Sequence, residues 1–221
     1  GESLRNQDFS DSELAKKINE KWNIKLFSTY ASTEMSTAFT ECEFQIGGHH
    51  HPELIITEIL DENENPVQEG ESGELTITTL GVEAIPLLRF KTGDLVKAHY
   101  EACKCGRNTM RLGPVLGRKQ QMIKYKGTTL YPPAMNDILN DFNNILCYQI
   151  VIQSDEIGLD EIIIKVSAEN NDENFVNELR DHFRAKLRVS PKIEVLDFEV
   201  LSKNVFNPTS RKPINFIDLR N

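Results

Sequence analysis

The chain has 221 residues, enough for one large domain or two small ones, each with a hydrophobic core of its own. Hydrophobic residues at 39% and charged residues at 27% are typical of a globular protein that functions in water, and no apolar run approaches the roughly 20 residues of a membrane-spanning helix. The formal net charge of -9 argues against a nucleic-acid-binding surface, because phosphate binding depends on clustered lysine and arginine.

The first half of the chain is predicted to be mostly strands after one helix. Ser10 and Glu13 form a capping-box pattern at a helix start, and Leu14, Ile18 and Trp22 share one face of that helix. The strands expected after it are a short buried strand over 24–30 (IKLFSTY) and the segments 53–60, 73–80 and 86–90. The last of these is expected to end in a turn, KTGD.

From about residue 118 the pattern changes to that of a small α+β domain. A hairpin around Gly127 is followed by a helix that begins at Pro132-Pro133, then by two strands, a second helix and a closing strand. These later elements are expected at 148–153, 161–168, 173–187 and 192–200. Their order is ferredoxin-like. We therefore predict two domains, residues 1–117 and 118–221, which meet near Gly117-Arg118.

Three polar residues far apart in the sequence are candidates for a nucleotide site. Asp94 follows Gly93, which permits a positive φ, and its two oxygens suit a diol; the alternative is an ordinary solvated turn. Arg118 offers a planar set of donors for hydroxyl or phosphate oxygens, or else a structural ion pair. Lys212, in a polar stretch flanked by prolines, could offset charge on a phosphoryl group, although a single lysine of this kind is usually only solvated.

Three cysteines and a histidine form a candidate zinc site. Cys103 and Cys105 lie on a tight turn, and adjacent strands could bring Cys42 and His49 beside them to complete a closed set of three thiolates and one imidazole. Free or buried thiols are the alternative, and the histidines at 50 and 51 are substitutes for the one at 49. The remaining cysteine, Cys147, lies in an expected strand and is interpreted as a core residue. Four cysteines of this spacing do not form a secreted disulfide framework, which favours a cytoplasmic location.

Seven motifs, taken together, carry a resemblance to a known family. They are, in chain order, YASTE, ECEFQIGGH, GELTITTL, PLLRFKTGD, CKCGR, GRKQQMIKYKGTTLYP and SRKPINFIDLR. This series resembles phenylacetate–CoA ligases, members of the adenylate-forming acyl-CoA synthetase superfamily, but only their C-terminal portion. The resemblance implies an α+β fold: a strand-rich, distorted barrel-like part of a large nucleotide-binding domain over 1–117, with a zinc-pinned loop, followed by a mobile ferredoxin-like lid over 118–221.

The resemblance also implies a role for each candidate residue. At the nucleotide, Gly1-Glu2 would edge the adenine pocket, Tyr30 would stack on adenine, Thr33 would hold the AMP phosphate, Glu34 would bind Mg²⁺, Asp94 would bind the ribose diol and Arg118 would contact the nucleotide. Lys212 matches the lysine that forms the acyl-adenylate. Lys126-Gly127 match a hairpin that reaches the site for thioester formation, after rotation about a hinge at Gln120. The same cysteine and histidine positions recur in the family motif, which supports structural zinc.

The implied enzyme activates a carboxylic acid, with aryl acetate as the family's usual substrate. ATP would convert the acid to acyl-AMP, and coenzyme A would then take the acyl group. Three positions depart from the family pattern: Ala31 and Arg211 replace glycines, and Gln120 replaces the hinge aspartate. No Gly/Ser/Thr-rich phosphate loop is present in these 221 residues, so we expect them to be inactive alone.

Two other functions stay open. One is an adenylating ligase whose acyl acceptor is an amine or a hydroxyl instead of coenzyme A. The other is a non-catalytic module for ligand sensing or protein association. The expected partners are small molecules, with neither nucleic acid nor membrane, and a homodimer is also open because an incomplete large domain would expose apolar surface.

Overall fold

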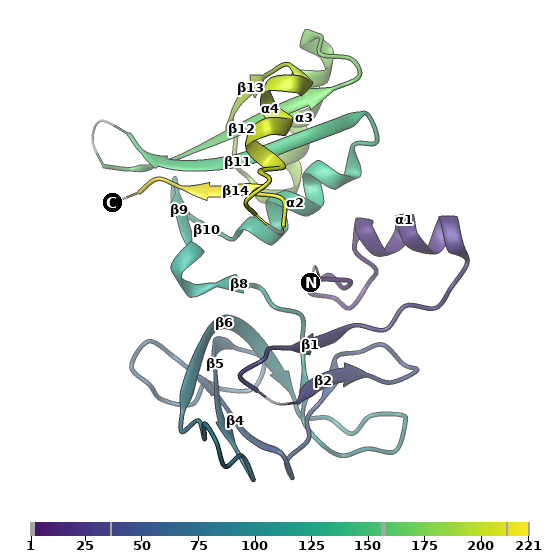
Figure 1. Cartoon of the computed structure of the whole chain (residues 1–221), viewed down its shortest axis with the longest axis vertical. Coiled ribbons are helices and arrows are strands. Elements are labelled where there is room, and N and C mark those ends of the chain that lie inside the picture. Colours follow the sequence, from purple (N-terminus) through teal and green to yellow (C-terminus); the bar gives the residue numbers. More distant parts are fainter. Residues whose placement is uncertain (1–2, 36, 156–157, 211, 221) are drawn as a thin grey trace. The chain divides into compact units, whose positions relative to one another are not determined.

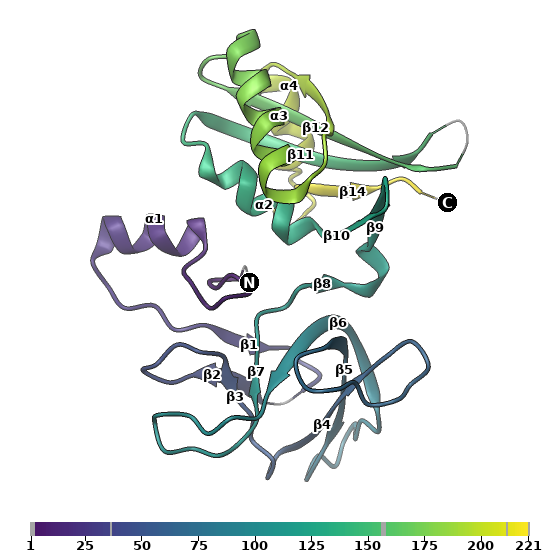
Figure 2. The same ribbon diagram turned by 180° about the vertical axis from the view of Figure 1, so that it is seen from behind.

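The computed structural model describes residues 3–35, 37–155, 158–210 and 212–220 (Figures 1 and 2). The chain divides into two compact units, residues 1–120 and 121–221, so the division falls after Gln120 and not after Gly117. Gly1 and Glu2, predicted to edge an adenine pocket, and Arg211 lie outside the described residues. Within the described ranges, no helix is both long enough and apolar enough to cross a membrane.

The first unit is one helix followed by antiparallel strands. Its elements are α1 (Glu13–Trp22), β1 (Thr29–Ala31), β2 (Ala38–Glu41), β3 (Gly48–His49), β4 (Ile55–Leu60), β5 (Ser72–Thr79), β6 (Phe90–His99), β7 (Arg111–Leu112) and β8 (Gly117–Arg118), and a 3₁₀ turn follows at Lys119–Gln121. In the described part of the chain the strand order is β1-β2-β3-β7-β6-β5-β4, and β8 pairs with β6. The core side chains include Met35, Phe39, Ile55, Leu75, Ile77 and Val96.

The segment that leads to β1 differs from the prediction in two places. The N-cap of α1 is Ser12, whose hydroxyl accepts from the Ala15 amide (3.4 Å), so the capping role predicted for Ser10 is wrong. The buried strand predicted over 24–30 is also wrong, because only Thr29–Ala31 form a strand and most of the apolar residues before it are exposed. A short apolar run indicates a local preference for a strand, but it does not show whether another element packs over its side chains and buries them.

A buried ion pair holds the N-terminal segment and α1 to the sheet. Arg5 donates to both oxygens of Glu41 (Nε–Oε1 3.1 Å), and the two side chains are only 3% and 1% exposed. Arg5 also pairs with Asp11, whose second oxygen accepts from Asn19 Nδ2 on α1 (2.9 Å). The apolar face predicted for α1 contributes less to this attachment, since Trp22 at its end is 72% exposed.

Glu41→Gln is expected to lower the free energy of unfolding by about 3 kcal/mol, because it leaves the Arg5 guanidinium buried with only the Asp11 carboxylate as a charged partner. Glutamine keeps an oxygen that accepts from the Ser28 amide (2.7 Å). The lost stability therefore reports the contribution of the Glu41 negative charge. Urea unfolding followed by far-ultraviolet circular dichroism measures it. The exposed neighbour Glu43→Gln is the matched control, expected within about 0.5 kcal/mol of the parent, and an equal effect of both changes would contradict the prediction.

The β4–β5 hairpin is as predicted, but the strand predicted over 86–90 and the turn after it are wrong. The KTGD motif lies inside β6, where the register with β5 shifts between Glu74 and Thr76. Four steps along β6, from 91 to 95, stand against two along β5, which makes a β-bulge. Gly93 in this bulge has φ of 78°, a conformation that glycine adopts without strain. Glycine with positive φ occurs in turns and in β-bulges alike, so the KTGD motif alone does not distinguish a turn from a bulge.

The second unit is α+β, as predicted. Its elements are β9 (Ile123–Tyr125), β10 (Thr128–Leu130), α2 (Pro132–Asp141), β11 (Ile145–Ser154), β12 (Asp160–Ala168), α3 (Glu173–Leu187), β13 (Lys192–Val195), α4 (Phe198–Val205) and β14 (Phe216–Asp218). Across the described residues of this unit, β9 and β10 form a separate hairpin and the main sheet has the order β13-β12-β11-β14. Its two central strands are antiparallel and each edge strand is parallel to its neighbour. α2 and α3 cover one face of this sheet and α4 covers the other (Figures 1 and 2).

The closing strand predicted over 192–200 is only partly correct. The chain leaves the sheet after β13 and begins α4, whose N-cap Asp197 accepts from an amide of the first turn (2.8 Å). Leu201 and Val205, four residues apart, pack on Cys147. Cys147 is buried, so its predicted place in the core is confirmed.

Candidate functional site

Three residues predicted to contact the nucleotide meet in the first unit. The Tyr30 hydroxyl, from β1, donates to Asp94 Oδ2 (2.6 Å), and Arg118 Nε, from β8, lies 3.4 Å from Asp94 Oδ1. The bulge of β6 and its pairing with β8 place Asp94 opposite Arg118. The carboxylate is 15% exposed and the guanidinium side chain is 64% exposed. Each carboxylate oxygen still has a second lone pair, so the group can accept further hydrogen bonds from a ligand.

Tyr30 is a fixed aromatic side chain. Burial, and then the hydrogen bond to Asp94, raise the pKa of Tyr30 above its ordinary value, so the hydroxyl stays a neutral donor. At its other side the ring lies 6.1 Å from the ring of Phe39, centroid to centroid. A ring held in this way is suited to present a flat apolar surface.

Thr33 and Glu34 lie on the turn that follows β1, just before the buried Met35, and both are exposed. The backbone amide of Glu34 itself, and then the Ser32 hydroxyl, hold the pKa of this carboxyl below its ordinary value. The carboxylate is therefore charged at neutral pH. One exposed carboxylate that leaves room for water and phosphate oxygens is a suitable ligand for Mg²⁺.

Four other predicted residues belong to the chain from residue 120 onward. Lys126 and Gly127 are the two turn residues of the β9–β10 hairpin, with φ of 47° and 82°, so this hairpin is confirmed. Gln120 is exposed and lies in the 3₁₀ turn at the division between the units. Lys212 is exposed, and its amide donates to the Ser210 hydroxyl (3.3 Å).

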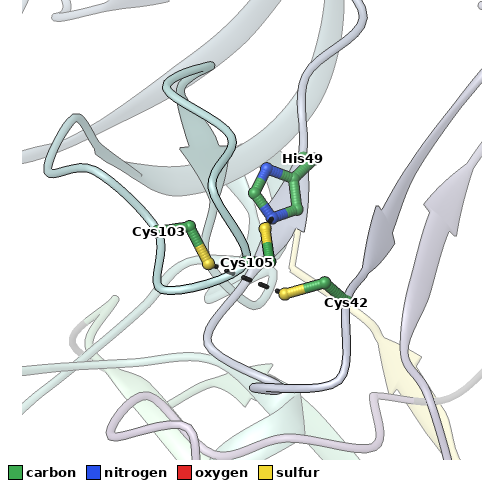
Figure 3. A group of neighbouring side chains, drawn as sticks. All are labelled: Cys42, His49, Cys103 and Cys105. Carbon is green, nitrogen blue, oxygen red and sulfur yellow. Dashed lines mark hydrogen bonds between the residues drawn. The ribbon is translucent and has the colours of Figure 1, made fainter.

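The four residues predicted to bind zinc come together in the first unit (Figure 3). Cys42 follows β2, His49 lies on β3, and Cys103 and Cys105 lie between β6 and β7. Their ligand atoms all lie within 4.8 Å of one another, with 3.6 Å between the sulfurs of Cys42 and Cys103 and 3.5 Å between Cys105 Sγ and His49 Nε2. Tetrahedral zinc with Zn–S bonds of about 2.3 Å requires ligand separations of about 3.7 Å, so this donor set fits zinc.

The electrostatics of Cys105 and His49 suit a metal. The backbone N–H of Arg107 lowers the pKa of the Cys105 thiol to about 7, whereas burial raises the pKa of Cys42. Burial also lowers the pKa of His49, which keeps the imidazole neutral. His49 Nδ1 lies 3.4 Å from the Thr109 hydroxyl, which leaves Nε2 toward the thiols. Thiolate and neutral imidazole are the forms that bind zinc.

The two neighbouring histidines have other contacts. His50 Nε2 lies 2.8 Å from the Ile55 carbonyl oxygen, and His51 Nδ1 lies 3.3 Å from a Glu53 carboxylate oxygen. The group of mutually close ligand atoms contains His49 and neither of them. The geometry therefore selects His49 from the three alternatives left by the sequence.

Several residues beside these sites were missed by sequence reasoning. Lys119 Nζ, next to Arg118 in the chain, donates to Glu74 Oε2 (3.0 Å), and the Glu74 side chain is only 8% exposed. A glutamate at an inward position of a predicted strand was the available signal for this pair. The sequence carries no signal for the contacts of Arg107 and Thr109, because these contacts depend on the path of a loop.

Comparison with known proteins agrees with the resemblance seen in the motifs. Residues 127–220 match the family described as AMP-binding enzyme C-terminal domain. Over 158 residues, 69% of this chain, the sequence is 37% identical to the phenylacetate-coenzyme A ligase of Thermus thermophilus. The chain is a relative of the phenylacetate–CoA ligases. The phenylacetate-coenzyme A ligase of Escherichia coli is 24% identical over 176 residues, 78% of this chain. The chain spans 35% and 39% of the lengths of these two ligases.

The fold is shared with solved adenylate-forming ligases. A 2-hydroxyisobutyryl-CoA ligase in its postadenylation state superimposes with a TM-score of 0.78 and 24% identity, over 98% of this chain and 47% of the other. An anthranilate CoA ligase in complex with anthranoyl-AMP superimposes with a TM-score of 0.62 and 16% identity. This match covers 85% of this chain and 39% of the other. The predicted fold class of this phenylacetate–CoA ligase relative, a strand-rich part followed by a small α+β part, is thereby confirmed.

Proposed function

We propose that this chain is the nucleotide-contacting and lid portion of an ATP-dependent acid–CoA ligase. The Asp94 cluster carries the proposal, because it joins a fixed aromatic ring, a carboxylate and a guanidinium. These groups match the three parts of a nucleoside monophosphate: Tyr30 for the base, Asp94 for the ribose diol and Arg118 for a ribose or phosphate oxygen. The names of the relatives support an acid–CoA ligase, with aryl acetate as the acid.

The first step joins the acid to AMP. A carboxylate oxygen attacks the α-phosphorus of ATP, and pyrophosphate leaves as acyl-AMP forms. Thr33 donates to the phosphate, and Lys212 supplies positive charge where negative charge develops. Glu34 would hold Mg²⁺, which offsets phosphate charge when bound. This phosphate chemistry needs a loop for the β- and γ-phosphates, so the 221 residues alone are not expected to complete it.

The second step transfers the acyl group. The coenzyme A sulfur attacks the acyl carbon, the bond to the AMP oxygen breaks, and the thiol proton is lost. The Lys126-Gly127 turn approaches the site for this step after the second unit rotates about Gln120. Rotation lets one small domain present Lys212 for adenylation and this hairpin for thioester formation.

The cysteine and histidine cluster is proposed to hold structural zinc. All four donors come from the protein, so no position is left for a reacting water. Cys42, His49, Cys103 and Cys105 would fix the loop between β6 and β7 to the β2–β3 hairpin. Such a site needs reduced cysteines, which fits a cytoplasmic location.

AMP binding tests the Asp94 cluster. The parent chain is expected to bind AMP about tenfold or more tightly than 2′,3′-dideoxy-AMP, because a hydrogen bond to a charged group contributes about 1.5–3 kcal/mol. Asp94→Asn is expected to bind both nucleotides equally and weakly. Isothermal titration calorimetry measures the four affinities, with Asp61→Asn on the β4–β5 connection as the control. Equal affinity of the parent for both nucleotides would remove the diol-binding role.

A further inference from the structure

Three aromatic rings of the first unit lie in series, and we refer to Tyr30, Phe39 and His50 as the ring series. The Tyr30 ring on β1 lies 6.1 Å from the Phe39 ring on β2, centroid to centroid, with 44° between the planes. The Phe39 ring stacks on the His50 ring at 5.8 Å, with 17° between the planes. Phe39 is only 1% exposed, so the middle ring cannot move without displacing its neighbours.

His50 is the anchored end of the ring series. Its backbone amide donates to the Met110 carbonyl (2.9 Å), and its Nε2 lies 2.8 Å from the Ile55 carbonyl oxygen and 3.1 Å from the Thr57 hydroxyl. The last two residues belong to β4, and among the described residues β1 and β4 stand at opposite ends of the strand order. The ring series therefore connects the two ends of this sheet.

The strand that carries Tyr30 has short backbone attachments. β1 pairs with β2 over three residues, and β2 pairs with β3, and β3 with β7, over two residue pairs each. Pairings of this length are weak without side-chain packing. The direction of the Tyr30 ring therefore depends on the Phe39 ring at one side and on the Asp94 carboxylate at the other.

The ring series begins beside the cysteine and histidine cluster. His49 Nε2 lies 3.5 Å from Cys105 Sγ, whereas the ring of the next residue, His50, lies against Phe39. Gly48, on the same strand as His49, lies so close to Phe39 that a Cβ atom there would be 2.6 Å from the Phe39 backbone. A metal held by His49 and by Cys42, which follows β2, would fix both segments that carry the two inner rings.

We propose that His50 and Phe39 are positioning residues for Tyr30, and that zinc in the cluster strengthens their hold on its ring. A ring that is already fixed loses little freedom when a base stacks on it, so the base binds more tightly. Zinc and the base then favour each other, because the same arrangement of the ring series suits both. The inference rests on the proposed function for the base contact of Tyr30 and for the zinc.

The affinities for AMP and for ribose 5-phosphate, which lacks the base, test the positioning role. Isothermal titration calorimetry of the zinc-loaded 221-residue chain is expected to show AMP binding about tenfold more tightly, because a base stacked on an aromatic ring contributes at least this much. His50→Ala is expected to reduce this ratio to about 3 or less while one zinc ion per chain is retained. His50→Phe, which keeps a flat ring against Phe39, should restore the ratio.

Matched controls separate the ring series from general loosening. His51→Ala removes the adjacent histidine, whose side chain is 44% exposed, and should leave the ratio near 10. Phe39→Leu should lower the ratio as His50→Ala does, whereas Phe90→Leu, in the same core, should not. The positioning role is overturned if His50→Ala keeps the parent's ratio, or if His50→Phe loses as much as His50→Ala.

Competition with a chromogenic chelator tests the coupling to zinc. At equal saturation, AMP is expected to raise the zinc affinity of the parent about threefold more than ribose 5-phosphate does, because coupling between two ligands is reciprocal. His50→Ala should remove this difference. Equal effects of the two ligands in the parent, or a parent that takes up no zinc, would overturn the coupling.

The signals of the Tyr30 ring in ¹H–¹³C spectra, recorded without nucleotide, separate this inference from the proposed function. His50→Ala is expected to shift them and His51→Ala to leave them in place, with Tyr125 of the other unit as the internal reference. If these shifts occur but the parent binds AMP no better than ribose 5-phosphate, the ring series is supported and the base contact in the proposed function is contradicted. Unshifted Tyr30 signals in His50→Ala would contradict the ring series itself.

Discussion

One zinc ion per chain is expected in protein purified without chelator, and His49→Ala is expected to release it. Structural zinc binds with an apparent free energy of about 10–16 kcal/mol in zinc-finger peptides. The first unit has a hydrophobic core besides this cluster, so we expect about 5 kcal/mol of that energy to appear as lost stability. Elemental analysis gives the zinc content, and thermal unfolding with and without a chelator gives the stability.

Two neighbouring substitutions make this test specific. His51→Ala removes an adjacent histidine outside the cluster, and Cys147→Ser removes a cysteine in the other unit. Both variants are expected to keep one zinc ion per chain, although Cys147→Ser will lose some stability through its own core. A zinc-free parent protein, or equal zinc content in His49→Ala and the parent, would rule out the zinc site.

In the intact ligase, Lys212→Ala is expected to slow formation of the acyl-adenylate about a thousandfold. The lysine would lie where charge develops on the α-phosphate, and loss of one such group typically reduces the rate by about 10²–10³. Exchange of radioactive pyrophosphate into ATP measures this step. Thioester formation from added acyl-AMP is expected to change little, because that step is proposed to use the Lys126-Gly127 turn instead. Lys203→Ala, an exposed lysine on α4, is the control.

The exchange assay, together with an assay of acyl transfer to different acceptors, separates the alternatives. Unchanged adenylation in Lys212→Ala would favour a non-catalytic module for sensing or association. Normal adenylation by the parent, with transfer to an amine or hydroxyl but not to coenzyme A, would identify a different adenylating ligase.

Elements with a long periodic pattern could be predicted from sequence. In α3 the residues Phe175, Leu179 and Phe183 recur every four positions and are all buried. This spacing alone predicts which face of the helix packs against the sheet. The bulge around Gly93 and the start of α4 at Asp197 could not be predicted in the same way. In both places the residues suit two local structures, and pairing with a distant strand or packing on the sheet decides between them.

The contacts of the candidate sites also differ in how far the sequence predicts them. Spacing within a short segment placed Cys103 and Cys105 together, and pairing of neighbouring strands brought in Cys42 and His49. Contacts between distant segments were not predictable. The Tyr30 hydroxyl reaches Asp94 across 64 residues, and no property of either segment specifies that hydrogen bond.

The bulge of β6 also restricts how this strand can change in length. It adds two residues to β6 relative to β5, since four steps from 91 to 95 oppose two from 76 to 74. Because side chains of a strand alternate with a period of two, this even insertion keeps the apolar residues on both sides of the bulge directed into the core. Deletion of Gly93 alone would leave one extra residue, an ordinary β-bulge, but would remove the residue that adopts φ of 78° without strain. A change of chain length at this point therefore alters the bulge that carries Asp94.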